Sequence, residues 1–193
     1  MIIMKKLLFA FATFALCSLA RSQEVDLKDF LGPNNSFHDP VFGIALTYPA
    51  GWEVVGGVRW GKDNGENTFR FQPIWPSEAR PGLYYQRFSA TSPRPSDFEA
   101  WFRESARKKA ESRSQGAKDY QNVPETFLFK TIAGQPSCSY LATFTIGGRK
   151  MAEHFVRIAG QTAYVMFFTQ GSAEEVEAVR AEIERMAETV RIP

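Results

Sequence analysis

The sequence predicts an α+β domain in which one antiparallel sheet carries two helices. Three observations lead to this prediction. Two groups of strand-like runs are separated by one helix-like segment and followed by another. Turns of only two to four residues join the runs of the second group, and such turns make neighbouring strands antiparallel. The last helix-like segment has one apolar stripe, so it needs a surface to cover, and the sheet provides one.

The first 22 residues have the features of a secretory signal peptide. Lys5 and Lys6 form a positively charged start, and the apolar run over 7–20 is shorter than the ~20 residues of a membrane-spanning helix. Small residues at Ala20 and Ser22 favour cleavage after Ser22. We therefore expect no transmembrane helix and an exported protein, periplasmic or extracellular, that is soluble after cleavage.

Lipidation of Cys17 is the alternative to a soluble product. A lipoprotein cysteine follows a small residue, whereas Leu16 is bulky. Plain cleavage after Ser22 is therefore the preferred interpretation.

The composition is that of an ordinary globular protein. Of the 193 residues, 44% are hydrophobic and 23% are charged, which excludes collagen-like, coiled-coil and charge-rich disordered classes and fits one domain. The net charge of +2 comes from the signal peptide over 1–22, because residues 23–193 contain 20 basic and 21 acidic side chains. The charge therefore gives no argument for nucleic-acid binding.

Residues 23–36 are polar and rich in Asn, Gly and Pro, and they predict a flexible leader before a single domain over 37–193. Asp63-Asn64-Gly65 favours a tight hairpin, since Asn-Gly tolerates the positive φ of a type I′ turn. His38 and Asp39 precede a proline and predict a turn at the end of a strand. The strands expected in this half cover 42–48, 52–60, 68–75 and 83–90.

Two capping boxes mark the helices. Ser96 with Glu99 predicts a helix that runs to about Ser114, and Ser172 with Glu175 predicts the start of the last helix. The strands expected between them cover 126–132, 138–146, 149–158 and 162–169. The apolar stripe of the last helix consists of Val176, Val179, Ile183, Met186 and Val190.

Parts of the sequence resemble the PsbP/Mog1-like superfamily, and the bacterial DcrB-like branch most closely. The resemblance covers about residues 37–192. It rests on an apolar strand followed by Tyr48-Pro49-Ala50-Gly51-Trp52, on the turn Ile132-Ala133-Gly134-Gln135-Pro136, and on the ending Thr189-Val190-Arg191-Ile192. The resemblance implies an αβα sandwich around a central antiparallel sheet, with a middle helix and a C-terminal helix. Most members are not enzymes and they bind different partners, so it does not assign a function.

The residue types needed for metal binding or catalysis are scarce. Beyond the signal peptide there are two histidines, His38 and His154, and one cysteine, Cys138. These are too few for a zinc site. Glu153 and His154 are neighbours in a strand and face opposite ways, so they form no dyad. Cys138 opens an apolar strand and is expected to be a buried thiol, with a reactive thiol as the alternative.

Motifs of nucleophilic catalysis and phosphate binding are missing. We therefore assign no catalytic residue, no metal and no cofactor. A catalytic pair of carboxylates, as used in glycoside hydrolysis, stays an alternative, because a sequence does not show the distance between two side chains in the fold.

The candidate partner-binding residues are Trp75, Tyr84 and Tyr85, which bracket a Pro-rich loop. Trp and Tyr are enriched where proteins meet partners, and this hypothesis requires at least one of the three rings to be exposed. The alternative is that these rings pack against the sheet or under a helix. Tyr84 and Tyr85 are adjacent in a strand, so one can be core while the other lies at the surface.

Arg103 and Arg107 on the first helix are the secondary candidates, for an anionic partner such as lipid headgroups. A solvated helix face is the alternative, because Glu99→Arg103 and Glu104→Lys108 are favourable i,i+4 pairs. Together these observations predict an exported, non-enzymatic binding domain whose partner is an envelope protein. A small-ligand-binding protein or a hydrolase without a recognisable motif is the alternative.

Overall fold

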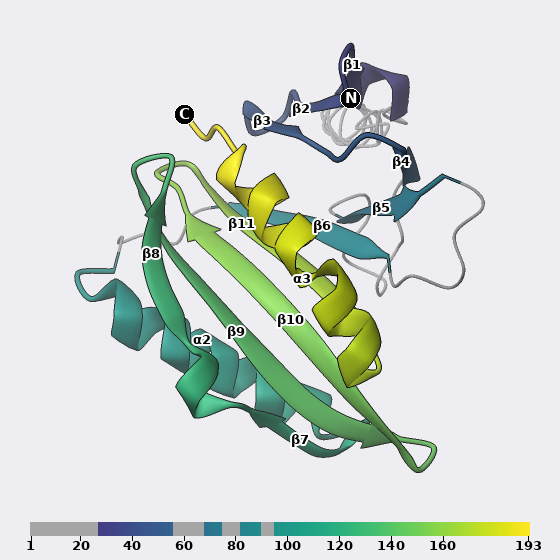
Figure 1. Cartoon of the computed structure of the whole chain (residues 1–193). Coiled ribbons are helices and arrows are strands. Elements are labelled where there is room, and N and C mark those ends of the chain that lie inside the picture. The colour runs from purple at the N-terminus through teal and green to yellow at the C-terminus, as the bar shows by residue number, and fades with distance from the viewer. Residues whose placement is uncertain (1–26, 56–67, 75–81, 90–94) are drawn as a thin grey trace, which may run out of the picture.

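The fold is an αβα sandwich, as expected. The computed structural model describes residues 27–55, 68–74, 82–89 and 95–193. Helices α2 (Phe98–Arg113) and α3 (Ala173–Glu188) lie on opposite faces of a large antiparallel sheet (Figure 1). The predicted fold class is therefore confirmed.

The large sheet has eight strands, in the order β4-β5-β6-β11-β10-β9-β7, with β8 also paired to β9. Strands β8 to β11 form the predicted meander. Strand β9 is long enough that β8 pairs with its first part and β7 with its last part. Strand β7 is not predicted by the sequence pattern, because it is short and polar. The bounds are β4 Trp52–Val55, β5 Thr68–Pro73, β6 Leu83–Ser89, β7 Lys118–Asn122, β8 Leu128–Ile132, β9 Gln135–Ile146, β10 Arg149–Ala159 and β11 Ala163–Gly171.

A second, three-stranded sheet precedes the large one. Its strands are β1 (Leu31–Gly32), β2 (Ser36–Asp39) and β3 (Ile44–Thr47), and a 3-10 turn at Leu27–Phe30 leads into it. Phe30 is buried, with its ring centroid 4.7 Å from that of Phe69. Residues 27–36 are thus part of the fold, which corrects the predicted flexible leader. Burial of one large ring outweighs the polar composition around it.

Alternation along the central strands divides the core into two layers. In β10, Val156 and Ile158 pack with residues of α3, whereas Phe155 and Ala159 pack with residues of α2. This is the two-residue period of a strand covered on both faces. The layer under α3 continues into the small sheet through Phe37.

Asp39 ties the small sheet to the large one. Its Oδ1 accepts hydrogen bonds from the backbone N–H of Val41 (3.0 Å) and Phe42 (3.4 Å), which forms the predicted turn. Its Oδ2 pairs with Arg87 of β6 and accepts from Tyr85 Oη at 3.4 Å. Both charged side chains are buried, so this is an ion pair inside the core.

The helix starts agree in part with the sequence. Ser172 and Glu175 form the complete capping box that was predicted. At α2 the N-cap is Asp97, whose side chain accepts from the N–H of Ala100 at 3.0 Å, and not Ser96. The predicted turn at Asn64-Gly65 lies outside the described residues.

Candidate functional site

The structure rules out one of the three predicted aromatic contact residues, Tyr85. Tyr85 has 0% exposure and packs with the α3 layer, and Tyr84 is half-buried, its ring centroid 4.9 Å from that of Phe168 in the α2 layer. The two rings face opposite sides, as predicted. The face of β6 that carries Tyr85 is buried, whereas the face that carries Tyr84 is partly exposed, with Phe88 at 38%, so only Tyr85 cannot be a surface contact. Trp75 lies outside the described residues.

The basic run of α2 is a paired, solvated face around Arg107. The Arg107 guanidinium binds Glu104 (Nε to Oε2, 2.7 Å) and pairs with Glu111, and Lys108 lies 3.6 Å from Glu104. These bonds hold the pKa of the Glu104 carboxyl at about 2, well below its usual range. The side chains form the i,i+3 and i,i+4 pairs of an ordinary exposed helix. Arg107 therefore lacks the unpaired charge that an anionic partner would need.

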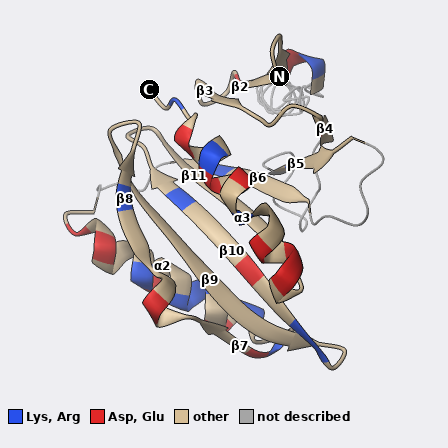
Figure 2. Ribbon diagram, viewed as in Figure 1, with Lys and Arg blue, Asp and Glu red and all other residues tan. Residues whose placement is uncertain are grey.

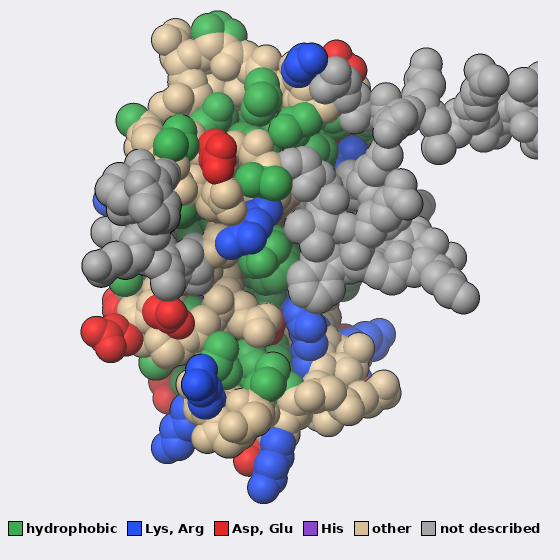
Figure 3. Space-filling model, turned by 90° about the vertical axis from the view of Figure 1, so that its right-hand side faces the viewer, with side chains coloured by type: hydrophobic (Ala, Val, Ile, Leu, Met, Phe, Trp, Pro, Cys, Tyr) green, Lys and Arg blue, Asp and Glu red, His purple; other side chains and the backbone are tan. Residues whose placement is uncertain are grey.

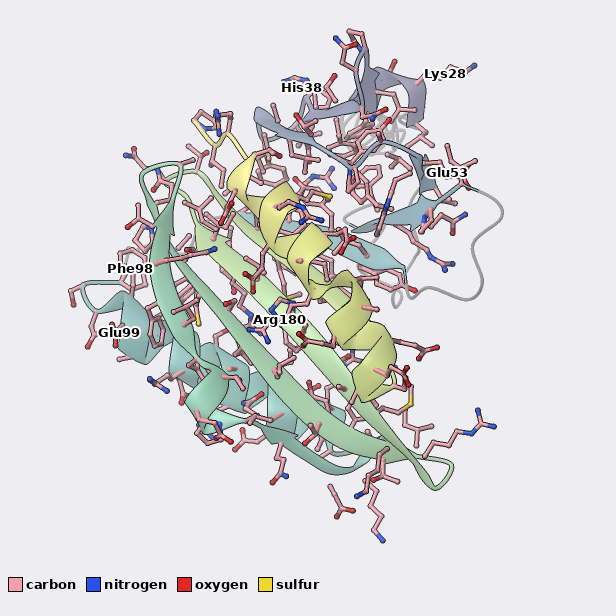
Figure 4. All side chains as sticks on the ribbon, viewed as in Figure 1. Lys28, His38, Glu53, Phe98, Glu99 and Arg180 are labelled. Atoms are coloured by element: carbon pink, nitrogen blue, oxygen red, sulfur yellow. The ribbon has the colours of Figure 1, made fainter. Side chains whose placement is uncertain are left out.

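Arg103 has a different environment from Arg107. Its guanidinium lies 4.8 Å from the ring centroid of Phe127 and 4.9 Å from that of Phe129. Phe98, Phe102 and Phe129 line an adjoining groove of about 350 Å³ with Thr131, Gly134 and Pro136. We call Phe98, Arg103, Phe127, Phe129 and this groove the α2–β8 surface. In Figure 4, Phe98 and Glu99 stand at the start of α2, beside β8.

A cavity of about 300 Å³ opens at the other end of α2, and Glu153 forms its floor. Glu153 is 1% exposed, and both its oxygens are engaged: Oε1 accepts from Arg113 Nη2 at 3.1 Å and Oε2 from Tyr120 Oη at 2.5 Å. Burial and the neighbouring carboxylate raise the pKa of Tyr120, which keeps its proton on the bond. The other lining residues, which complete what we call the Glu153 cavity, are Ser112, Gly116, Ala117, Phe144, Ile146 and Gln170.

Two further cations lie between α2 and the sheet. The Lys109 ammonium lies 4.8 Å from the ring centroid of Phe155, and burial lowers the pKa of Lys109 to about 8. Arg157 is buried, donates from Nη1 to Ser105 Oγ at 2.9 Å, and covers the ring of Tyr140. Acidic and basic bands alternate along β10 in Figure 2. No local sequence pattern predicts this layer, because its residues come from α2, β7, β10 and β11.

The remaining potentially reactive side chains, Cys138 and His154, are buried. Cys138 is buried, as expected, and burial raises the pKa of its thiol to about 12. His154 faces α3, where its Nε2 lies 3.6 Å from Glu184, whereas Glu153 faces α2, so the two form no dyad. In the part of the chain that the structure describes, no three His, Cys, Asp or Glu side chains gather into a possible metal site.

Comparison with solved structures identifies the fold. The solution structure of cyanobacterial PsbP (CyanoP) from Synechocystis sp. PCC 6803 is similar at a TM-score of 0.59 and 13% identity, over 84% of this chain and 95% of that one. LpqN, involved in cell envelope biogenesis of Mycobacterium tuberculosis, is similar at a TM-score of 0.46 and 11% identity, over 84% and 87%. No family model and no curated protein matches the sequence. The CyanoP match shows a PsbP-like fold and leaves function open.

None of the helices in the described ranges combines the length and the apolar character needed to cross a bilayer.

Proposed function

We propose that this protein is an exported accessory domain of the cell envelope that works by binding another protein and not by catalysis. Within the PsbP/Mog1-like superfamily we assign it to the bacterial DcrB-like branch. The leader over 1–22 supports export, and the Tyr48–Trp52 motif supports the branch. The burial of the Cys138 and His154 side chains supports binding over catalysis.

The observation that carries the proposal is the α2–β8 surface. Arg103 lies over two half-buried phenylalanine rings beside an aromatic groove, and arginine and aromatic side chains dominate the energetics of protein interfaces. Among the described residues, β8 pairs with β9 alone. Its other edge can therefore accept an extended segment of the partner as an added strand, with side chains seated in the groove.

Paired substitutions on opposite faces of β8 test this surface. Thr131 is exposed and lines the groove, whereas Leu128 is exposed on the other face of the same strand. Thr131→Arg should reduce recovery of the partner from native envelope extracts by about 10-fold or more, as expected for loss of a hot-spot contact. Leu128→Arg should leave recovery unchanged, and both variants should have the melting temperature of the wild type. Equal recovery with Thr131→Arg and wild type would remove this surface from consideration.

Export is tested by intact mass. Expressed with its own leader, the protein should be recovered starting at Gln23. Retention of residues 1–22, or a diacylglyceryl adduct on Cys17, would contradict the proposed route.

The Glu153 cavity favours small-ligand binding as a second candidate function. A melt-shift screen against metabolites together with a generic hydrolase panel distinguishes it from protein binding. Turnover in that panel would contradict the non-enzymatic proposal.

A further inference from the structure

The Glu153 cavity stands beside an excess of positive charge that is partly or fully buried. Three cations, Lys109, Arg113 and Arg157, lie between α2 and the sheet. Glu153 is the acidic residue beside them, and it forms an ion pair with Arg113. Within the described residues, neither Lys109 nor Arg157 has a carboxylate within ion-pair distance. Desolvated charges without a counterion are costly, so an anion in this region would be stabilised.

A basic side chain also lies at the rim of the cavity, on the same face of the sheet. Arg149 is the cross-strand partner of Ile146, a lining residue, and is exposed at the β9–β10 turn. Figure 3 shows further Lys and Arg side chains beside hydrophobic ones in the lower part of the side that it draws. Such an arrangement attracts anions to the cavity.

The walls of the cavity suit a compact apolar body. Phe144 stacks with Tyr120 at 5.3 Å between ring centroids, and Ile146 is 47% exposed at the rim. The volume of about 300 Å³ lies at the small end of ligand pockets, which run from about 300 to 1,000 Å³. A single ring or a short branched chain therefore fits better than a large cofactor.

We propose that the Glu153 cavity binds a small organic anion with an apolar body, such as an aromatic carboxylate. Arg113 receives the charged group. It is 32% exposed, and in the described part of the chain one of its five N–H donors is used, for Glu153, so it can hold Glu153 and a ligand carboxylate at once. The Gln170 amide supplies a second donor, and Phe144 and Ile146 cover the body of the ligand. A cationic ligand would instead face Arg113 and Lys109.

Titration calorimetry with two isosteric probes tests the charge preference. Benzoate should bind saturably with a Kd of about 1 mM or tighter and should raise the melting temperature. Benzylamine should not bind, and sodium chloride at matched ionic strength should not reproduce the shift. Inorganic phosphate, which lacks the apolar body, should bind more weakly than benzoate.

Two variants and two control variants locate the site. Arg113→Gln should weaken benzoate binding about 10-fold or more, since a charge-assisted hydrogen bond is lost, whereas Arg107→Gln, one to two turns earlier on α2, should bind like wild type. Ile146→Asp places a negative charge at the exposed rim without touching the core and should also weaken binding. It keeps the test decisive if Arg113→Gln fails to fold. Thr131→Arg should leave benzoate binding intact, which separates this site from the α2–β8 surface.

Absence of benzoate binding to the wild-type protein would overturn the proposal. Equal binding of benzoate and benzylamine would do the same, as would unchanged benzoate binding by both Arg113→Gln and Ile146→Asp.

Discussion

Burial shifts the pKa values of the Cys138 and His154 side chains. Each lies on a central strand and under a helix, Cys138 beneath α2 and His154 beneath α3. Burial disfavours the charged form, so the pKa of the thiol rises to about 12 and that of the imidazole falls to about 4. Both side chains are therefore neutral at pH 7.

Cys138→Ala should keep the fold and lose only ~1 kcal/mol of unfolding free energy, because few heavy atoms leave a packed site. Denaturant melts measure the loss, and the native wild-type protein should not react with a thiol-directed dye. A variant with a normal melt but no partner or benzoate binding would show that Cys138 is a chemical site after all.

His154 should make the protein acid-sensitive. The groups that face it are Glu184 and Arg180 of α3 and Lys130 of β8, and burial together with the two cations lowers its pKa from 6.5 to about 4. The unfolded chain therefore binds a proton before the folded one. Stability is full above pH 6.5 and falls by roughly 3 kcal/mol as the pH drops to 4.

The measurement is a series of denaturant melts between pH 8 and 4 for wild type and His154→Gln. The wild type should lose more stability over this range, and the two curves should run parallel above pH 7. Equal slopes throughout would show that His154 titrates normally.

Helix α2 connects the two candidate sites. Its first turns border the α2–β8 surface, and its last turn supplies Arg113 to the Glu153 cavity. The exact start of the helix therefore affects both. Ser96 and Asp97 are both good N-cap residues, and the observed bond from Ala100 N–H goes to Asp97.

Asp97→Ala should cost about 1 kcal/mol of unfolding free energy, whereas Ser96→Ala should be close to neutral. Chemical denaturation of the two single variants measures the difference. A larger loss for Ser96→Ala would restore the N-cap that the sequence suggested.

At the scale of the whole molecule, the Asp39–Arg87 pair joins the two sheets. Arg87 also lies 5.4 Å from the ring centroids of both Phe42 and Phe69, so the guanidinium is enclosed by aromatic rings from each sheet. Removing one member of a buried pair leaves the other charge uncompensated.

Arg87→Met should therefore destabilise the protein by about 3–5 kcal/mol, and Asp39→Asn combined with Arg87→Met should cost less than the two single changes added together. A double-mutant cycle by denaturation measures the coupling. Additive losses would mean that the pair does not connect the sheets energetically.

The candidate sites were predictable only in part. Alternation along β6 placed Tyr84 and Tyr85 on opposite faces, but it could not say which face is buried, which depends on where strand β2 of the small sheet packs. Arg103 was visible in the sequence, whereas its contact with Phe127 and Phe129 requires β8 to lie beside α2. The Glu153 cavity left no sequence signal, since Arg113 and Tyr120 lie far from Glu153 and Gln170 in the chain.

The sequence by itself determined the α+β class, the meander and the last helix with its cap. These features depend on local periodicity, short turns and side chains three residues apart. Tertiary structure alone decided that Phe30 belongs to the core, that β7 shares β9 with β8, and that cations collect around Glu153. Such features depend on packing between distant segments, where the burial of one ring or one charge outweighs the local composition that a sequence displays.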